Sequence, residues 1–400
     1  MLYRIAYALV KEYTTLCIGL FFRKVEVKGK HHIPKGPVIF TPNHQNAFLD
    51  GILTSCLGRK NVSFLARADV FNIKILKPIL LFFKIVPVYR MRDGASNMEN
   101  NYGSFKAVKE RLDKGKSILI FPEGNQKFIR HLRPLKKGVF RILDLCKDNK
   151  EIPQVVPVGI NFESHTRSGF NLVLEYGEPV PFQFPLSNGY LQEKNLLTER
   201  MLPLFQNIQN YDLQMLSESS WLNEHPYTLK GIQEEREMLI HRYPEQFLAN
   251  VSEWRHLSFT NGLLPWHDKL SIADWLKVMI VGIIYLPIMP FRTLVRWLSK
   301  RINRQKEFKF SMTFGFSLVL LPFYVFLLFY IFVQFLPAYY FLIVILLLYV
   351  YAKNKEVLER FAFHFKKWRR RSSKRSEVER MEELAAKIRK YLSDSGLASI

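Results

Sequence analysis

Short apolar runs alternate with helix-like stretches through the first half of the chain. Four apolar runs rich in β-branched side chains are predicted as strands: residues 38–42, 61–67, 117–124 and 154–162. Three stretches with apolar residues at helical spacing are predicted as helices: residues 47–58, 99–115 and 136–148. Buried strands that alternate with helices predict an α/β fold, with a mostly parallel sheet flanked by helices. Residues 171–180 are predicted as an edge strand of this sheet.

The pattern becomes helical and more polar over residues 187–272, where apolar residues recur three and four positions apart. We find no chemical motif in this region. A helical insert that covers a site or an acyl groove fits the pattern, and so does a plain structural subdomain. The second interpretation is favoured.

The last third of the chain is strongly apolar. Residues 311–352 contain no charged side chain and are about twice as long as the ~20 residues that one membrane crossing needs. They predict a two-helix hairpin with a break near Gln334–Pro337. Residues 275–291 are shorter and contain two prolines, so a re-entrant or broken helix is predicted there. Basic runs lie on both sides of the hairpin, and the positive-inside rule places both of its ends in the cytoplasm.

Both ends of the chain carry amphipathic helices. Residues 1–22 resemble a signal peptide, but Lys11 and Glu12 interrupt the apolar run and no small-residue cleavage site follows. An interfacial helix lying on the membrane and a helix packed on the neighbouring domain are equally compatible with this pattern. Residues 377–392 place apolar side chains on one helical face, which suits docking on a partner or on the membrane.

The composition narrows the class of partner. The net charge of +23 favours anionic partners, and the apolar runs select lipid over nucleic acid, for which no binding module is present. Three scattered cysteines imply no disulfide framework, which fits a reducing cytosolic face. No cluster of ligands shows metal-binding spacing, so neither a metal ion nor another cofactor is predicted.

The segment TPNHQNAFLDG follows a predicted strand and contains a histidine and an aspartate, His44 and Asp50. Acyl transfer to a hydroxyl needs a general base near neutral pKa, and a carboxylate on the other imidazole nitrogen orients that base. The acceptor hydroxyl would then be the nucleophile. Taken alone, a loop histidine beside a helix-turn carboxylate explains the same residues.

A second segment, SILIFPEGNQKFIRHLRPLKKG, ends a predicted strand in Glu123 and Gly124 and continues into a basic stretch. Glycine there lets the backbone approach a ligand closely. Lys127, Arg130 and Arg133 follow the carboxyl end of the strand, where α/β sheets bind ligands, and such side chains bind phosphate. A third segment, KIVPVYRMR, places Arg90 at the end of a short apolar run.

Together, NHQNAFLD, PVYR, FPEG and VVPVGI resemble, in order and spacing, four blocks of the phospholipid/glycerol acyltransferase (PlsC-type) family. The resemblance covers roughly residues 1–182. It implies His44 as the base and Asp50 as its orienting group. It also implies that Arg90, Glu123 and Gly124 position the acceptor, with acyl-CoA or an acyl carrier protein as the donor.

Two departures from the family pattern matter. The box here is His-x5-Asp rather than His-x4-Asp, similar to that of fungal glycerol-3-phosphate/dihydroxyacetone-phosphate acyltransferases. One extra helical residue swings a side chain by about 100°, so a loop or bulge must absorb it if Asp50 is to reach His44. After FPEG the family has Thr-Arg, whereas this chain has Asn125-Gln126-Lys127. The phosphate ligand is therefore predicted to move to Lys127 or Arg130.

The sequence thus predicts an integral membrane acyltransferase with its catalytic domain on the cytoplasmic face. The acceptor would be glycerol-3-phosphate or dihydroxyacetone phosphate, and membrane lipid a further partner. One alternative acceptor is 1-acylglycerol-3-phosphate (lysophosphatidate), giving phosphatidate; another alternative is a non-catalytic membrane lipid-binding anchor. The predicted parts are an N-terminal helix (1–22), a catalytic domain (23–186), a helical region (187–272), membrane segments (273–353) and a basic cytoplasmic tail (354–400).

Overall fold

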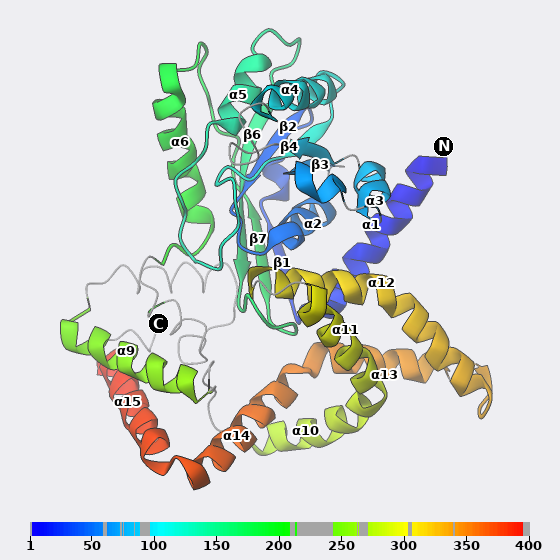
Figure 1. The fold of residues 1–400 in the computed structure, drawn as a ribbon, viewed down its shortest axis with the longest axis vertical. Helices are drawn as coiled ribbons and strands as arrows, with labels where there is room; N and C mark the ends of the chain where they lie inside the picture. Colours follow the sequence, from blue (N-terminus) through cyan, green and yellow to red (C-terminus); the bar gives the residue numbers. More distant parts are fainter. Residues whose placement is uncertain are drawn as a thin grey trace.

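The computed structural model describes most of the chain, namely residues 2–58, 62–72, 74, 76–83, 85–88, 97–208, 213, 243–261, 263, 271–302, 306–338 and 341–394. Two parts are visible in Figure 1: a twisted sheet with helices against it, and a set of C-terminal helices below it.

The sheet has seven strands in the order β1-β7-β6-β2-β5-β3-β4. The strands are β1 (Val25–Lys28), β2 (Val38–Pro42), β3 (Val62–Arg67), β4 (Val86–Val88), β5 (Ser117–Leu119), β6 (Gln154–Phe162) and β7 (Leu172–Tyr176). All neighbouring pairs are parallel except β6 and β7, which are antiparallel. The predicted α/β fold with a mostly parallel sheet is confirmed.

The prediction of an edge strand at 171–180 is wrong. β7 lies inside the sheet, between β6 and β1, and the edges are β1 and β4. The segment Val25–Lys28 pairs in parallel with β7 and covers it. The segment is only four residues long, too short for a distinct alternating pattern, so the covering strand was not expected.

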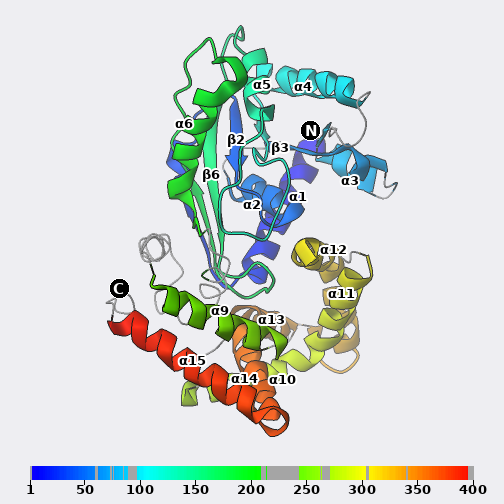
Figure 2. The same ribbon diagram turned by 60° about the vertical axis from the view of Figure 1, so that its left-hand side comes forward.

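Helices cover both faces of the sheet (Figure 2). The helices of this part of the chain are α1 (Leu2–Phe21), α2 (Ala47–Leu57), α3 (Leu76–Phe82), α4 (Asn97–Asp113), α5 (Gly138–Leu145) and α6 (Leu191–Met201). Successive residues of β2 alternate between two cores: Phe40 packs with residues of α1 and α2, and Ile39 with residues of α4, α5 and α6. This period of two follows from the pleat of a strand buried on both faces.

Short 3₁₀ turns lie at Lys30–His32, Ala68–Asn72, Asn188–Tyr190, Leu202–Leu204 and Leu286–Ile288. The first of these precedes β2, and the last interrupts the C-terminal helices at Pro287. Proline has no backbone N–H to donate, so a helix commonly bends or restarts at such a position.

Helix α1 packs with one side on the α/β domain, which is one of the two arrangements considered from the sequence. Cys17, Ile18 and Phe21 are buried in the core beside α2, whereas Ile5 and Leu9 are exposed. The helix therefore packs on the α/β domain and still presents an apolar stripe outward.

The C-terminal helices are α9 (Glu245–Thr260), α10 (Ile272–Tyr285), α11 (Met289–Ile302), α12 (Lys306–Val333), α13 (Phe341–Asn354), α14 (Glu356–Ser373) and α15 (Arg375–Asp394). Two stretches among the described residues are long and apolar enough to cross a membrane, Ile272–Arg301 with mean hydropathy 1.9 and Phe308–Val333 with 2.5. The break between α12 and α13 falls at the predicted Gln334–Pro337.

The apolar face of the tail helix is covered within the chain, so its prediction as a docking face for a partner or the membrane is wrong. Val378, Met381, Leu384 and Ile388 of α15 are buried against α9, where Trp254 is also buried. The pattern showed an amphipathic face correctly but could not show which surface would cover it.

Candidate active site

The predicted histidine and aspartate meet where β2 ends and α2 begins. His44 Nδ1 lies 2.9 Å from Asp50 Oδ2. The same carboxylate oxygen accepts hydrogen bonds from the backbone N–H groups of Gln45 and Asn46, each at 2.7 Å. Asp50 is fully buried. Two backbone N–H groups and the His44 ring nitrogen thus converge on one oxygen of a buried carboxylate, which fixes Asp50 beside His44.

The additional residue of the box is absorbed at the start of α2. Asn46 is the N-cap of the helix, and Ala47 adopts a positive φ of 44°. That left-handed backbone is uncommon for a residue other than glycine. The Leu49 N–H donates to the Asn46 carbonyl at 3.0 Å, which tightens the first turn. The strained turn lets Asp50 reach back to His44 across six positions.

One face of the His44 imidazole packs against an aromatic ring, which restricts its orientation. It stacks on Phe121, with ring centroids 3.7 Å apart and planes 11° apart. A carboxylate at Nδ1 favours the tautomer with the proton on that nitrogen, so Nε2 is left as the basic position. Because β2 and β5 are parallel, the residues that follow these two strands lie together at the carboxyl-terminal end of the sheet.

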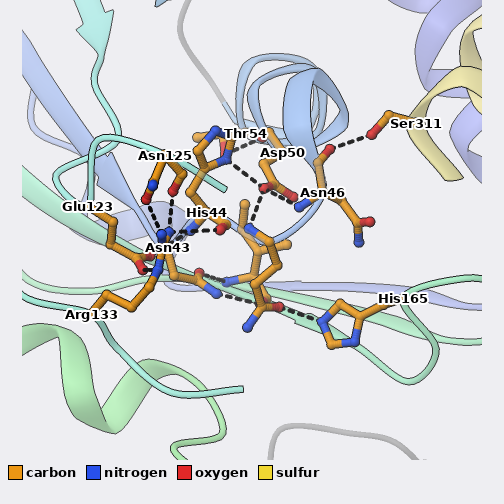
Figure 3. A network of polar contacts seen from close by, with 12 residues as sticks. Asn43, His44, Asn46, Asp50, Thr54, Glu123, Asn125, Arg133, His165 and Ser311 are labelled. Carbon is orange, nitrogen blue, oxygen red and sulfur yellow. Dashed lines mark hydrogen bonds and ion pairs between the residues drawn. The ribbon is translucent and has the colours of Figure 1, made fainter. Parts of the chain in front are cut away.

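Glu123 binds the backbone of the histidine box rather than projecting into solvent (Figure 3). Its Oε1 accepts the His44 N–H at 2.8 Å, and its Oε2 accepts Arg133 Nε at 2.5 Å. Burial raises the pKa of Glu123 above its usual value, and the nearby Arg133 guanidinium opposes that rise. Gly124 follows in the left-handed region with φ 77°, which glycine adopts without strain.

The basic residues after FPEG fall into two groups. Arg130 is 2% exposed and donates to the Gln206 side-chain oxygen and, at 3.0 Å, to the Glu163 carbonyl. Arg133 binds Glu123, Asn125 and, at 3.3 Å, the His44 carbonyl. Lys127 is exposed, and only its backbone N–H binds the box, at the His44 carbonyl (3.2 Å). Arg90, the remaining predicted ligand, lies outside the described residues.

Three further residues organise the box and were not selected from the sequence. The Asn43 side chain exchanges two hydrogen bonds with the backbone of Ile160 in β6, at 2.7 and 3.1 Å. Gln45 binds His165 Nε2 at 2.8 Å and the Ile129 carbonyl at 2.9 Å. Asn43 and Gln45 flank His44 in the same motif, which was the available signal. His165 had none, because it is distant in sequence.

Comparison with known proteins assigns the region that holds this site. Residues 24–161 match the family model described as Acyltransferase. The chain is 32% identical over 123 residues to the chloroplastic 1-acyl-sn-glycerol-3-phosphate acyltransferase LPAT1 of Arabidopsis thaliana, covering 30% of this chain and 33% of that protein. It is 31% identical over 123 residues to the chloroplastic 1-acyl-sn-glycerol-3-phosphate acyltransferase BAT2 of Brassica napus, covering 30% and 34%.

A more remote match is an uncharacterized acyltransferase of Schizosaccharomyces pombe, 23% identical over 253 residues, with 42% of this chain and 38% of that protein covered. The chain therefore spans about a third of the length of the curated relatives it matches. Among solved structures it is similar to the 1-acyl-sn-glycerophosphate acyltransferase PlsC of Thermotoga maritima, at 20% identity and a TM-score of 0.39, covering 50% of this chain and 78% of that one. Residues 24–161, which contain His44, Asp50 and Glu123, are thus the part of the chain that matches the Acyltransferase family model and overlaps in kind with these relatives.

Proposed function

We propose that this protein transfers a fatty acyl group from a thioester carrier to a hydroxyl of glycerol-3-phosphate or dihydroxyacetone phosphate. The observation that carries the proposal is the His44–Asp50 contact of 2.9 Å beside the buried Glu123 turn, within a domain of an acyltransferase family. Acyl-CoA and acyl carrier protein both supply the thioester that this chemistry requires.

The reaction needs one proton carrier. His44 Nε2 removes the proton of the acceptor hydroxyl while the oxygen attacks the thioester carbonyl carbon. The resulting tetrahedral oxyanion collapses, the carbon–sulfur bond breaks, and the imidazolium returns the proton to the leaving thiolate. The Asp50 carboxylate stabilises the imidazolium between these steps. The Gly124 N–H is bonded to the Phe121 carbonyl, so the N–H groups of Glu123 and Asn125 are the proposed donors to the oxyanion.

The acceptor phosphate is assigned to exposed lysines. The backbone N–H of Lys127 binds the His44 carbonyl, so this lysine lies beside the histidine box. The Lys136 side chain lies against Gly124, and its Cγ would be 3.1 Å from a Cβ built on that glycine. Arg130 and Arg133 are held by protein groups and shape the loop instead. Arg90 remains a proposed phosphate ligand.

Lysophosphatidate is the alternative acceptor. Both plant relatives carry 1-acyl-sn-glycerol-3-phosphate acyltransferase in their names, which favours this reading for the family. A small acceptor must gain most of its binding energy from phosphate, whereas a lysolipid adds about 0.8 kcal/mol per buried CH₂.

The deciding experiment compares kcat/KM for glycerol-3-phosphate, dihydroxyacetone phosphate and lysophosphatidate with one acyl donor at fixed detergent. We expect glycerol-3-phosphate to be used at least as well as lysophosphatidate, and unphosphorylated glycerol hardly at all. A preference above about tenfold for lysophosphatidate would select the alternative acceptor. Absence of thioester consumption with every acceptor would leave the non-catalytic lipid-binding anchor.

We also propose that the chain is an integral membrane protein with the acyltransferase domain on the cytoplasmic face. Both ends of the α12–α13 hairpin contact that domain: Ser311 binds Asn46, and Lys353 binds the Gly19 carbonyl at 2.7 Å. The side chains between these ends are largely exposed, as lipid-facing residues would be.

Contacts at both ends of α10–α11 favour a re-entrant segment over a single span, although residues 272–301 are long enough to cross a membrane. Asp274 at its start pairs with Arg360 of α14 at 3.3 Å, and Ser299 near its end lies 3.3 Å from Thr313 of α12. Both contacts lie near the domain-side ends of the hairpin. Tags inserted at 334–338 should be reached only from the opposite side of the membrane, and tags in the 302–306 connection from the domain side.

A further inference from the structure

Helix α12 begins inside the acyltransferase domain before it becomes an exposed apolar helix. Phe310 and Phe314 are buried, and both rings lie 5.1 Å from that of Phe21 at the end of α1. They belong to the same core cluster as Phe40 of β2 and Leu49 of α2. The first turns of this helix are therefore part of the domain core, although the family match ends far earlier, at residue 161.

Ser311 lies between these two phenylalanines and touches the histidine box. Its side chain is fully buried, and its Oγ donates a hydrogen bond to the Asn46 carbonyl (Figure 3). Asn46 in turn donates its N–H to Asp50 Oδ2, the oxygen that also binds His44. A continuous chain of hydrogen bonds thus joins α12 to the carboxylate that orients His44.

The helix surface is also fitted to α2 at the next turn. A Cβ built on Gly315 would stand 3.2 Å from the Phe48 ring, so glycine at this position permits close packing of α12 on α2. One turn further along, the Tyr13 hydroxyl of α1 donates to the Leu318 carbonyl at 2.6 Å. The contact between α12 and the α/β domain thus consists of the Ser311 hydrogen bond, close packing at Gly315 and the Tyr13 hydrogen bond.

The turn that Ser311 holds is strained, and the Asn46 side chain within it lacks hydrogen-bond partners. Ala47 carries a positive φ, a conformation that costs roughly 1–3 kcal/mol and persists only when its surroundings impose it. Asn46 is fully buried, and neither its side-chain oxygen nor its side-chain nitrogen has a hydrogen-bond partner in the described part of the chain. A strained and incompletely bonded turn depends on contacts from outside, and Ser311 supplies one.

We infer that α12 is a positioning element of the active site, and that Ser311 holds the Gln45–Ala47 turn in the arrangement that places Asp50 on His44. Ser311 is a positioning residue, since it acts through Asn46 and Asp50. The inference rests on the proposed function where it concerns rate. It also implies that the membrane segment cannot be removed without disturbing the catalytic box.

The test compares Ser311→Ala with Ser317→Ala in the full-length protein. Ser317 lies on the same helix, but its hydroxyl binds the Thr313 carbonyl of that helix at 2.7 Å, so it is a matched control. Ser311→Cys is a second variant, with similar volume and a weaker donor, in case alanine impairs folding. Two readouts are measured: hydrogen exchange of the Gln45 and Asn46 amides, and kcat and KM for donor and acceptor.

We expect both Ser311 variants to exchange these amides faster than the control and to lower kcat by about 3- to 10-fold, the range for loss of one hydrogen bond. KM for the donor should not change. Unchanged exchange, or faster exchange with unchanged kcat, would overturn the inference, because the serine would then serve packing alone. If the wild-type protein transfers no acyl group, the proposed function fails, and the exchange experiment still shows whether Ser311 holds the turn.

Discussion

The α/β domain and the C-terminal helices differ in where they place apolar side chains. In the sheet, successive residues such as Ile39 and Phe40 are both buried, one on each face. In α12 both environments occur in one helix: Phe314 is 1% exposed and Phe323, nine residues later, is 70% exposed. The helix leaves the protein core and continues with side chains that suit a lipid environment.

This difference explains how one chain holds polar chemistry beside apolar surface. At the carboxyl-terminal end of the sheet, the His44 ring, the His44 N–H and Glu123 are each bound by a carboxylate or a guanidinium within the buried histidine box. The outward face of the later helices has few polar groups to satisfy. If chemistry belongs to the first region and membrane affinity to the second, changes away from the contact between Ser311 and Asn46 should affect only one of the two properties.

The largest effect is expected from the base. His44→Ala should lower kcat by about 10²- to 10⁴-fold, because the acceptor hydroxyl loses its proton acceptor. Asp50→Asn should also impair kcat, because an amide cannot stabilise the imidazolium. Acyl transfer is measured on protein extracted from membranes in wild-type yield. Near-normal turnover by the alanine variant would exclude His44 as the base.

A charge on the exposed face of α12 should affect membrane insertion instead. Phe326→Lys places a cation mid-helix, which costs about 2.5–3.5 kcal/mol in a membrane. The share of protein that resists alkaline extraction should fall sharply. Ile152→Lys is the matched control, since Ile152 is an exposed apolar residue of the α/β domain. Equal effects of both substitutions would remove the distinction between the two regions.

Within the α/β domain, substitutions of the exposed Lys127 and the buried Arg130 should affect different properties of the protein. Lys127→Gln should raise the acceptor KM about 10-fold, as expected for the loss of one charge-assisted contact, and leave the melting temperature near that of the wild type. Arg130→Gln should chiefly lower the melting temperature, because Gln206 and the Glu163 carbonyl lose a buried donor. A donor-specific rise in KM for Lys127→Gln would assign that lysine to the acyl carrier.

The last expected effect, on stability alone, concerns the junction of the two regions. Lys355 binds the Leu20 and Phe21 carbonyls at the end of α1, and its pKa is lowered from 10.5 to about 7, chiefly by burial. The charges of Arg292 and Lys353 contribute to this lowering, whereas Glu359 opposes it. Between pH 7 and 9 the unfolded chain keeps a proton that the folded chain has lost, so this residue makes stability rise with pH.

The rise should approach about 1.4 kcal/mol per pH unit, the limit for one proton. Thermal unfolding from pH 7 to 9 should show a flatter pH dependence for Lys355→Met than for the wild type. The exposed Lys390 of α15 provides a control substitution, Lys390→Met, that should keep the wild-type slope. Identical slopes for all three proteins would mean that Lys355 remains charged in the folded state.

The outcome at individual residues shows what a pattern can convey. The motif around His44 predicted the contact with Asp50 and the need for a bulge, because both follow from local spacing and helix geometry. The same reasoning treated Arg130 and Arg133 alike as phosphate ligands, yet both bind protein groups. Local sequence does not show that Gln206 and Glu163 lie beside Arg130, since those contacts join distant segments.

By itself, the sequence determined the alternation of strands and helices, the apolar C-terminal segments and the chemistry available at each motif. Hydrophobic period and residue type decide these locally. The tertiary structure alone decided that β1 covers β7, that α9 covers α15, and that Ser311 reaches Asn46 across 265 positions. An apolar face or a hydroxyl indicates which kind of partner would satisfy it, but only the packing of the whole chain determines which partner it contacts.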